Sequence, residues 1–260
     1  MEKTLTKKGI ATDPMPFTPT HVSFVSNFLK QEYVTAGIEF ESSDVVYGGV
    51  SVERFLFQRE NSVRMGGSLR LLYVGQVTRD RGLHSAIEEL KFLCPESRSK
   101  ISLTVVGDSL ETRYKDDLFE QARNPRLSQQ ILFEGKMSQD EMPRIYRQHD
   151  ILVMPSLRKE GLPFTMMEAM LSGCAVVTTG SGGAMEIAQL ADLPLFPKGD
   201  AQALSRILEG LICNRKKLEQ IAKRGQEVAL RELSSERGIT LSGDKIQSLC
   251  GFLGEHRFYR

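Results

Sequence analysis

Two glutamates, Glu160 and Glu168, are separated by seven residues and follow a short apolar run. Pro163, which lies between them, is favoured at the first position of a helix because it has no N–H to leave unpaired and its φ is fixed. Such a helix would place Glu168 about 7 Å further along the helix axis than Pro163. The first amides of a helix lack partners and attract phosphate, and here they belong to Phe164, Thr165 and Met166. Since carboxylates accept hydrogen bonds from hydroxyls, the stretch predicts a ligand that is both phosphorylated and rich in hydroxyls.

The ordinary interpretation of two glutamates is a pair of solvated surface charges. Gly161 and Pro163 at the end of a buried strand favour a functional interpretation instead. Glu168 is also flanked by apolar residues on both sides, namely Met166, Met167, Ala169 and Met170. A wholly solvated helix face is therefore not expected there.

A second candidate region is the loop from Gly75 to Gly82, which contains Gln76 and Arg81. Gly75 ends an apolar run, and Arg81 stands where a helix is expected to begin. A guanidinium at this position can bind a diphosphate in a bidentate manner. Arg79 is followed by Asp80 and is expected to be a solvated charge.

A third candidate is the glycine-rich turn over residues 180–183. Consecutive glycines let a backbone approach a ligand closely, although a plain tight turn explains them equally well. Glu186 follows the turn, and it either belongs to the site or caps the helix expected over residues 184–189.

From residue 69 onward, short apolar runs alternate with segments of helical spacing. The expected strands cover residues 69–75, 101–106, 130–133, 151–154, 175–178 and 193–196. The expected helices cover residues 81–93, 112–122, 138–147 (with a capping box of Ser138 and Glu141), the stretch from Pro163 on, 201–212, 216–233 and 235–252. This alternation predicts an α/β fold in which a parallel sheet is wrapped by helices on both faces and followed by C-terminal helices.

Ligands of such sheets bind at the carboxyl ends of the strands. Glycines and polar residues follow five of the expected strands, at 75–76, 107–108, 134–136, 156–161 and 180–183. This convergence predicts one site built from several loops.

The chain before residue 69 is less regular. Residues 1–20 include three prolines and predict an irregular lead-in. A helix is expected over residues 28–36, a brief strand over 44–47, and a polar linker over 59–68.

Composition excludes several classes of function. The net charge of +1 gives no reason to expect nucleic acid as a partner. The four cysteines are scattered, which favours a reduced, cytoplasmic setting. No apolar run approaches the roughly 18–20 residues that cross a bilayer, and no apolar signal core is found near residue 1.

Motifs of other chemistries are missing from the sequence. It contains no Walker A pattern, no G-x-G-x-x-G fingerprint and no G-x-S-x-G elbow. It also contains no H-E-x-x-H, no D-x-D pair and no Cys/His cluster, so we expect neither a metal site nor a bound cofactor. The four histidines are isolated from one another.

The motifs together resemble the donor-binding half of a GT-B glycosyltransferase of the large retaining family 4, also called group 1. The family's E-x7-E pair matches Glu160 and Glu168, and its V-G-R-x-x-x-x-K-G loop matches residues 74–82. Its N-G-V-D-x-x-x-F segment matches residues 48–55, its G-G-x-x-E turn matches residues 182–186, and a late P-x-G-D matches residues 197–200. The resemblance runs from about residue 21 to residue 252.

The resemblance implies a Rossmann-like donor domain and a role for each matched residue. Glu168 would hold the ribose hydroxyls of a nucleotide, and Glu160, the expected catalytic residue, would hold hydroxyls of the donor sugar. Arg81 would bind the diphosphate, and the amides near Phe164 would take the distal phosphate or the sugar. The base would lie against residues 134–137, which include Lys136 and Met137. The remaining donor-binding residues are expected to be Gly75, Gln76, Gly161, Thr165 and Met166.

This sequence departs from the family pattern in two positions and in length. Gln76 stands where an arginine is common, so one phosphate-binding charge is missing, and Gly48 replaces an asparagine. The family also has a second, N-terminal domain that supplies the acceptor site. We therefore expect residues 1–44 to be a lead-in and a remnant of the acceptor domain, 45–234 the donor-binding domain, and 235–260 a helix that crosses back.

The resemblance implies a hexosyltransferase that moves a sugar from a nucleotide-diphosphate sugar to an acceptor, with retention of configuration and without metal. Two alternatives remain open. The chain either binds the nucleotide sugar but needs a separate partner for the acceptor half, or is a sugar-nucleotide epimerase of the same architecture. A lipid-linked acceptor would imply peripheral contact with a membrane, for which Lys216, Lys217, Lys223 and Arg224 are candidates. The base, the sugar and the acceptor are not indicated by the sequence.

Overall fold

The computed structural model describes residues 20–57, 68–127, 130–200 and 202–243. Its centre is a five-stranded parallel sheet with the order β5-β4-β3-β6-β7. The strands are β3 (Leu69–Val74), β4 (Ile101–Val106), β5 (Ile131–Gly135), β6 (Ile151–Met154) and β7 (Ala175–Thr178). β6 and β7 are buried along their whole length, as expected of parallel strands covered by helices on both faces. The parallel α/β sheet expected from the sequence is therefore confirmed.

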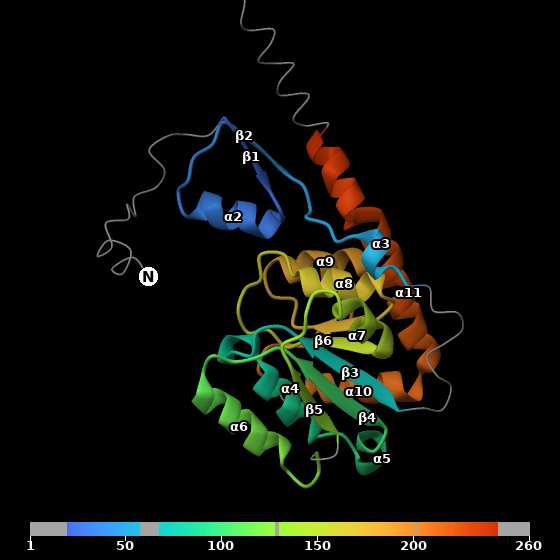
Figure 1. Cartoon of the computed structure of the whole chain (residues 1–260). Helices are drawn as coiled ribbons and strands as arrows, with labels where there is room; N and C mark the ends of the chain where they lie inside the picture. Colours follow the sequence, from blue (N-terminus) through green and yellow to red (C-terminus); the bar gives the residue numbers. More distant parts are fainter. Residues whose placement is uncertain (1–19, 58–67, 128–129, 201, 244–260) are drawn as a thin grey trace, which may run out of the picture.

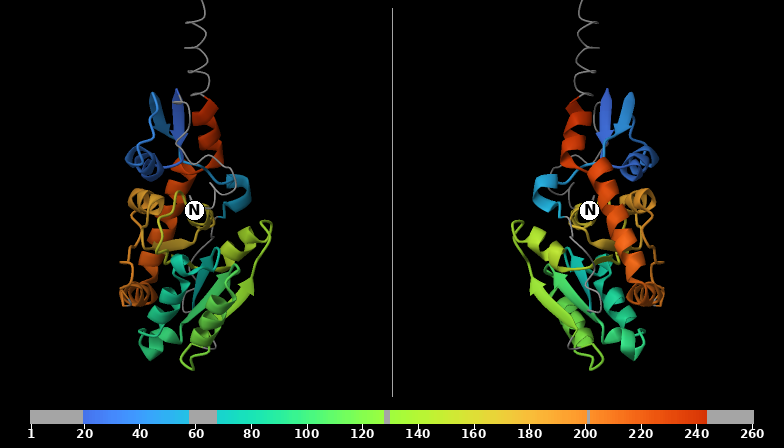
Figure 2. Two further views of the ribbon diagram at one scale, coloured as in Figure 1. Left: turned by 90° about the vertical axis from the view of Figure 1, so that its left-hand side faces the viewer. Right: turned by 90° about the vertical axis from the view of Figure 1, so that its right-hand side faces the viewer.

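Helices cover both faces of this sheet (Figures 1 and 2). One face packs against α4 (Leu83–Leu90), α6 (Thr112–Ala122) and α10 (Ala203–Cys213). The other packs against α3 (Val52–Phe55), α7 (Met142–Gln148), α8 (Phe164–Leu171), α9 (Gly183–Ala191) and the C-terminal half of α11 (Arg215–Glu232). A short helix, α5 (Pro95–Arg98), precedes β4. The spacing of buried residues explains the docking, as in α4, where positions 83, 86, 87 and 90 form one apolar stripe.

A smaller unit stands apart from the main sheet, with α8 and α9 between them (Figure 1). It consists of the parallel strands β1 (His21–Phe24) and β2 (Ser42–Val45), joined by α2 (Asn27–Thr35). The Ser26 side chain caps α2 by accepting a hydrogen bond from the amide of Leu29.

The chain returns to this unit after α11. Val50 and Ser234 form a parallel bridge, and residues 235–243 are helical. Gly49 allows the crossing, because a Cβ there would lie 2.2 Å from the carbonyl carbon of Ser234. The segment that joins the small unit to the main sheet therefore lies beside the segment that follows α11.

Several expected boundaries were wrong. The helix expected from residue 81 is a 3-10 turn, η1 (Arg79–Arg81), followed by α4, because Gly82 adopts a left-handed conformation with φ of 73°. The helix expected from residue 138 begins at Met142. Its predicted capping pair is half formed, in the turn before the helix: Glu141 Oε2 accepts from the Ser138 amide as in a capping box, but it also accepts from the Ser138 hydroxyl. The strand expected over 193–196 is only a single bridge between Thr178 and Leu195.

Other expectations shifted by a few residues or lie beyond what is described. The strand expected over 44–47 covers Ser42–Val45, and the one expected from residue 130 begins at Ile131. Nearly all of the predicted linker, and the expected helix beyond residue 243, lie outside the described residues.

Candidate functional site

Three loops meet at the carboxyl ends of β3, β6 and β7. The carbonyl of Asp80 accepts hydrogen bonds from the amides of Leu157 (2.9 Å) and Arg158 (3.0 Å), which joins the first loop to the second. The amide of Glu160 donates to Ser181 O (3.1 Å), and the amide of Gly183 donates to Glu160 O (2.7 Å). The second and third loops are thereby joined as well, so the convergence expected from the sequence is present for these three loops.

Glycines make this close approach possible. A Cβ at Gly82 would lie 2.0 Å from Pro155 O, and one at Gly183 would lie 2.0 Å from Gly161 O. A side chain at either position would force the loops apart, since real Cβ contacts are longer than 3.0 Å.

Glu160 is buried, with 5% of its surface exposed. One of its oxygens, Oε1, accepts a hydrogen bond of 2.8 Å from the hydroxyl of Ser156. The same oxygen forms an ion pair with Arg81 Nη1, also at 2.8 Å. Arg158 Nε lies 3.6 Å from the same oxygen. Glu160 and Arg81, which the sequence placed in separate loops, are therefore in direct contact.

Glu168 lies near the middle of α8 and is half-buried. Its Oε2 accepts a hydrogen bond of 2.8 Å from the hydroxyl of Tyr146, a fully buried residue of α7. Burial raises the pKa of Glu168, while the Tyr146 hydrogen bond and the charge of Arg54 oppose that rise. The carboxylate is thus held by a neighbouring helix rather than solvated.

The N-terminus of α8 differs in detail from the expectation. Pro163 is the residue before the helix and not its first residue. The amide of Met166 donates to Pro163 O at 3.1 Å, so it is not free for a ligand as we had expected. The amides of Phe164 and Thr165 remain as candidates. Half of the Phe164 side chain is exposed, and its ring lies close to Gly48, where a Cβ would be 3.2 Å from Phe164 Cζ.

The other predicted donor-binding residues are placed as follows. Gly75 follows β3, and the carbonyl of Gln76 accepts a hydrogen bond of 2.9 Å from the hydroxyl of Tyr73. Gly161 lies under α2, because a Cβ there would meet Leu29 Cδ1 at 3.2 Å. Lys136 and Met137 follow β5, which β4 and β3 separate from β6. Met137 packs against the apolar cluster that contains Tyr146 of α7, the partner of Glu168.

Glu186 does not cap its own helix. Its Oε1 accepts a hydrogen bond from the amide of Phe28 (2.5 Å), and its Oε2 accepts from the amide of Asn27 (3.0 Å) and the hydroxyl of Tyr47 (3.0 Å). Ser26 Oγ also donates to Gly161 O at 2.8 Å. Glu186 therefore caps α2 and fastens the small unit onto the second and third loops.

The sequence assigned no specific role to Tyr146, Ser156 or Arg158, and it did not indicate that Glu186 docks the small unit. Ser156 and Arg158 lie inside the stretch that the glutamate pair defines, so proximity in sequence was an available signal. Tyr146 is 22 residues from its partner and carried no such signal.

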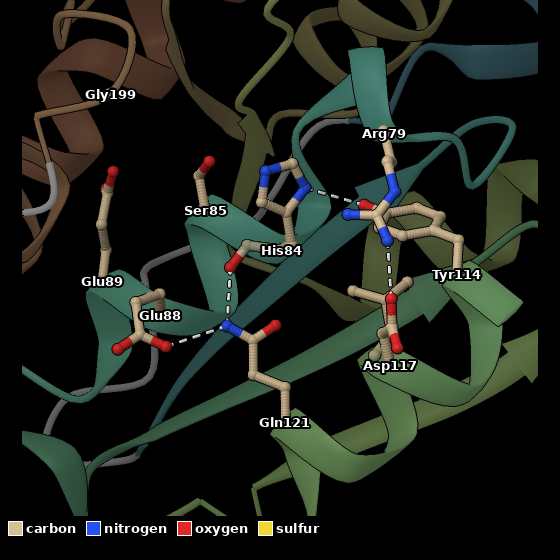
Figure 3. Close-up of a pocket in the computed structure, with 10 residues that line it drawn as sticks. Arg79, His84, Ser85, Glu88, Glu89, Tyr114, Asp117, Gln121 and Gly199 are labelled. Carbon is tan, nitrogen blue, oxygen red and sulfur yellow. Dashed lines mark hydrogen bonds and ion pairs between the residues drawn. The ribbon is translucent and has the colours of Figure 1, made fainter.

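A separate cavity of about 440 Å³ lies between α4 and α6 (Figure 3). Its charged groups largely satisfy one another: Arg79 pairs with Asp117 (2.6 Å), and Gln121 donates to Glu88 (3.0 Å). His84 Nδ1 lies 2.9 Å from the Tyr114 hydroxyl. None of the predicted donor-binding residues lines this cavity.

No helix among the described residues is long and apolar enough to cross a membrane. Within the same ranges, no three His, Cys, Asp or Glu side chains gather in a group suited to hold a metal ion.

Several curated relatives are glycosyltransferases, and some of them are named for polysaccharide biosynthesis. The amylovoran biosynthesis glycosyltransferase AmsK of Erwinia amylovora is 29% identical over 71% of this chain and 45% of its own length. The lipopolysaccharide 1,2-N-acetylglucosaminetransferase of Salmonella typhimurium is 26% identical over 66% of this chain and 47% of its own length. The chain spans about half the length of the curated relatives that it matches.

Solved structures agree in fold. Anabaena Alr3699/HepE, crystallised in complex with UDP, has a TM-score of 0.79 at 22% identity and covers 88% of this chain, which covers 64% of that one. The C-terminal domain of the group 1 glycosyl transferase LpcC of Francisella tularensis has a TM-score of 0.62 at 26% identity, over 71% of this chain and 98% of that domain.

A family model described as glycosyl transferases group 1 matches residues 55–228, the part of the chain that holds both glutamates and all three loops. The chain therefore belongs to the group 1 glycosyl transferases, and it has the Rossmann-like α/β architecture of its GT-B structural neighbours.

Proposed function

We propose that the three loops bind a nucleotide-diphosphate sugar, whose sugar is transferred to an acceptor with retention of configuration and without a metal or a cofactor. The observation that carries the proposal is the pair of carboxylates beside a cation and a helix N-terminus. The carboxylates of Glu160 and Glu168 can accept hydrogen bonds from hydroxyl groups. The cation of Arg81 and the N-terminus of α8 can bind phosphate groups. A nucleotide-diphosphate sugar carries both kinds of group.

Each glutamate has a distinct part in this proposal. Glu168 accepts the ribose hydroxyls, and Glu160 accepts hydroxyls of the transferred sugar. Contacts with described residues fall on one oxygen of each carboxylate, Oε1 of Glu160 and Oε2 of Glu168, so the second oxygen is available to the ligand.

The departing diphosphate gains negative charge as the glycosidic bond breaks. Arg81 and the amides of Phe164 and Thr165 are the groups that would stabilise this charge, since they are fixed before the reaction begins. The names of the curated relatives do not give a nucleotide base. One structural neighbour was crystallised with UDP and with UDP-glucose. We therefore propose uridine as the first base to test.

A second candidate function is favoured by the span of the match. The chain covers about half of its curated relatives, and the second candidate places the acceptor site outside the given sequence or on a partner. In that case the chain binds the nucleotide sugar but transfers it only when the acceptor half is supplied. Transfer by this chain alone, measured with labelled donor and candidate glycan acceptors, would contradict this second candidate.

Donor binding tests the main proposal. UDP-, GDP- and ADP-sugars are titrated calorimetrically against the wild type, Glu168→Ala and the control Glu120→Ala, which alters an exposed residue of α6. We expect the wild type and the control to bind one donor equally. Glu168→Ala should bind it at least about 10-fold more weakly, because a hydrogen bond to a charged group contributes about 1.5–3 kcal/mol. No binding of any donor by the wild type would contradict the proposal.

A further inference from the structure

Two guanidinium groups converge on one carboxylate oxygen at the meeting point of the loops. Arg81 Nη1 lies 2.8 Å from Glu160 Oε1, and Arg158 Nε lies 3.6 Å from the same atom. The two arginines come from different loops, 77 positions apart in the sequence. Glu160 therefore serves as a shared counter-ion for both.

The backbone fixes this convergence. Asp80 directly precedes Arg81, and its carbonyl accepts hydrogen bonds from the amides of Leu157 (2.9 Å) and Arg158 (3.0 Å). The close passage of Gly82 under Pro155 O holds the same two loops together. Arg158 is thus kept next to Arg81 by main-chain bonds and does not depend on its own side-chain contacts.

Neither arginine is saturated by its present partners. The two contacts of the Arg158 guanidinium are long, 3.6 Å to Glu160 and 3.5 Å to Asp80, against about 2.7–3.2 Å for a normal hydrogen bond. Arg81 Nε is buried and has no hydrogen-bond partner among the described residues. The carboxylates therefore do not use up the donor groups of either side chain, and Arg158 in particular could bind an anion that comes closer to it than Glu160 does.

We propose that Arg158 is a second diphosphate-binding residue beside Arg81, and that the diphosphate displaces Glu160 from both. This inference rests on the proposed donor binding and adds a residue and an order of events to it. In the free protein Glu160 neutralises the two cations. In the complex the diphosphate takes over that task, and the released Glu160 turns its oxygens to the sugar hydroxyls. Arg158 would supply the charge that Gln76 does not, since Gln76 offers no cation to the diphosphate.

The competing explanation is that Arg158, a half-exposed residue, only screens the surface around Asp80 and Glu160. The two explanations differ in which part of the ligand matters. A phosphate-binding arginine raises the affinity for a ligand more as the phosphate charge of that ligand grows. An arginine that only screens the surface does not raise the affinity for any of these ligands.

The first test compares a nucleoside, its monophosphate and its diphosphate, with the base that the wild type prefers. Affinities are measured by calorimetry for the wild type, Arg158→Gln and the control Lys159→Gln. Lys159 is the neighbouring cation, and its Nζ pairs with Glu32 of α2 at 2.8 Å. We expect Arg158→Gln to weaken diphosphate binding by about 10-fold or more, monophosphate binding less, and nucleoside binding not at all. Arg158→Lys should fall between, because it keeps the charge but loses the bidentate geometry.

The second test uses the counter-ion. Glu160→Gln removes the charge that competes with the diphosphate and keeps the size of the side chain. We expect this variant to bind the free nucleoside diphosphate more tightly than the wild type does. The added affinity gained from the sugar of the nucleotide-diphosphate sugar should shrink, because an amide is a weaker acceptor than a carboxylate. Thermal unfolding followed by circular dichroism checks that each variant is folded.

The outcomes separate the two levels of the proposal. If the wild type binds no nucleotide at all, the proposed function fails and this inference fails with it. If the wild type binds a nucleoside diphosphate but Arg158→Gln binds it as well as Lys159→Gln does, only the role of Arg158 is overturned. If Glu160→Gln weakens the free diphosphate as much as the nucleotide sugar, the displacement of Glu160 is overturned.

Discussion

At the scale of single residues, the site depends on hydroxyl groups that hold the two glutamates. Ser156 holds Glu160 and Tyr146 holds Glu168, each at 2.8 Å. Glu168, which stays in place on binding, therefore loses little freedom when a ligand binds, and this favours affinity. The Tyr146 hydroxyl also stabilises the charged form of Glu168 against the burial that raises its pKa.

Tyr146→Phe should therefore change the pH dependence of nucleotide binding. The ribose hydroxyls need the ionised form of Glu168, so affinity falls as the pH is lowered through the raised pKa of that group. Loss of the Tyr146 hydrogen bond raises the pKa further, so the fall should occur at higher pH in the variant than in the wild type. Calorimetric titrations between pH 5 and 8 measure this shift. An unchanged pH profile would show that Tyr146 only fills the core.

At the scale of elements, one buried acid connects α4 with the start of α10. Glu89 is 1% exposed, and burial together with the charge of Asp200 raises its pKa to about 7. A backbone hydrogen bond from Leu204, in the first turn of α10, opposes the rise. The carboxyl group thus joins the two helices in its protonated form at mildly acidic pH.

The sign of its effect on stability follows from the two pKa values. The unfolded chain releases the Glu89 proton near pH 4.5, whereas the folded chain keeps it until about pH 7. The folded state is therefore favoured below pH 4.5, and this contribution is lost as the pH rises through 7, by up to about 3 kcal/mol. Glu89→Gln should reduce the fall in unfolding free energy between pH 5 and 8. Urea unfolding at several pH values tests this, and an unchanged fall in the variant would contradict it.

The elements themselves followed from local patterns more readily than their ends did. The apolar runs of β3, β4, β6 and β7 are visible in the sequence because helices cover both faces of these parallel strands. The start of α4 was not predicted, because it depends on the left-handed conformation of Gly82. The backbone of Pro155, just after β6, passes so close to Gly82 that no side chain would fit there. That constraint joins two loops more than 70 residues apart, and no local pattern contains it.

At the scale of the whole molecule, the small unit of β1, α2 and β2 rests on the loops of the candidate site. Glu186 binds the N-terminus of α2 across 159 positions of sequence, and Ser26 binds Gly161 across 135. The two glutamates could be predicted as site residues from their spacing, whereas the docking of α2 could not, because it depends on tertiary contacts alone. The division of the chain into remnant, donor-binding domain and crossing helix stays a prediction.

The central claim is that the two glutamates and the two arginines together hold a nucleotide-diphosphate sugar. The most direct measurement is a crystal structure of the chain with that ligand bound. We predict that the ribose hydroxyls lie within hydrogen-bond distance of Glu168, that the diphosphate contacts Arg81 and Arg158, and that Glu160 has moved from the arginines to the sugar. A nucleotide bound elsewhere, for example in the cavity between α4 and α6, with Glu168 still free of ligand, would contradict the account.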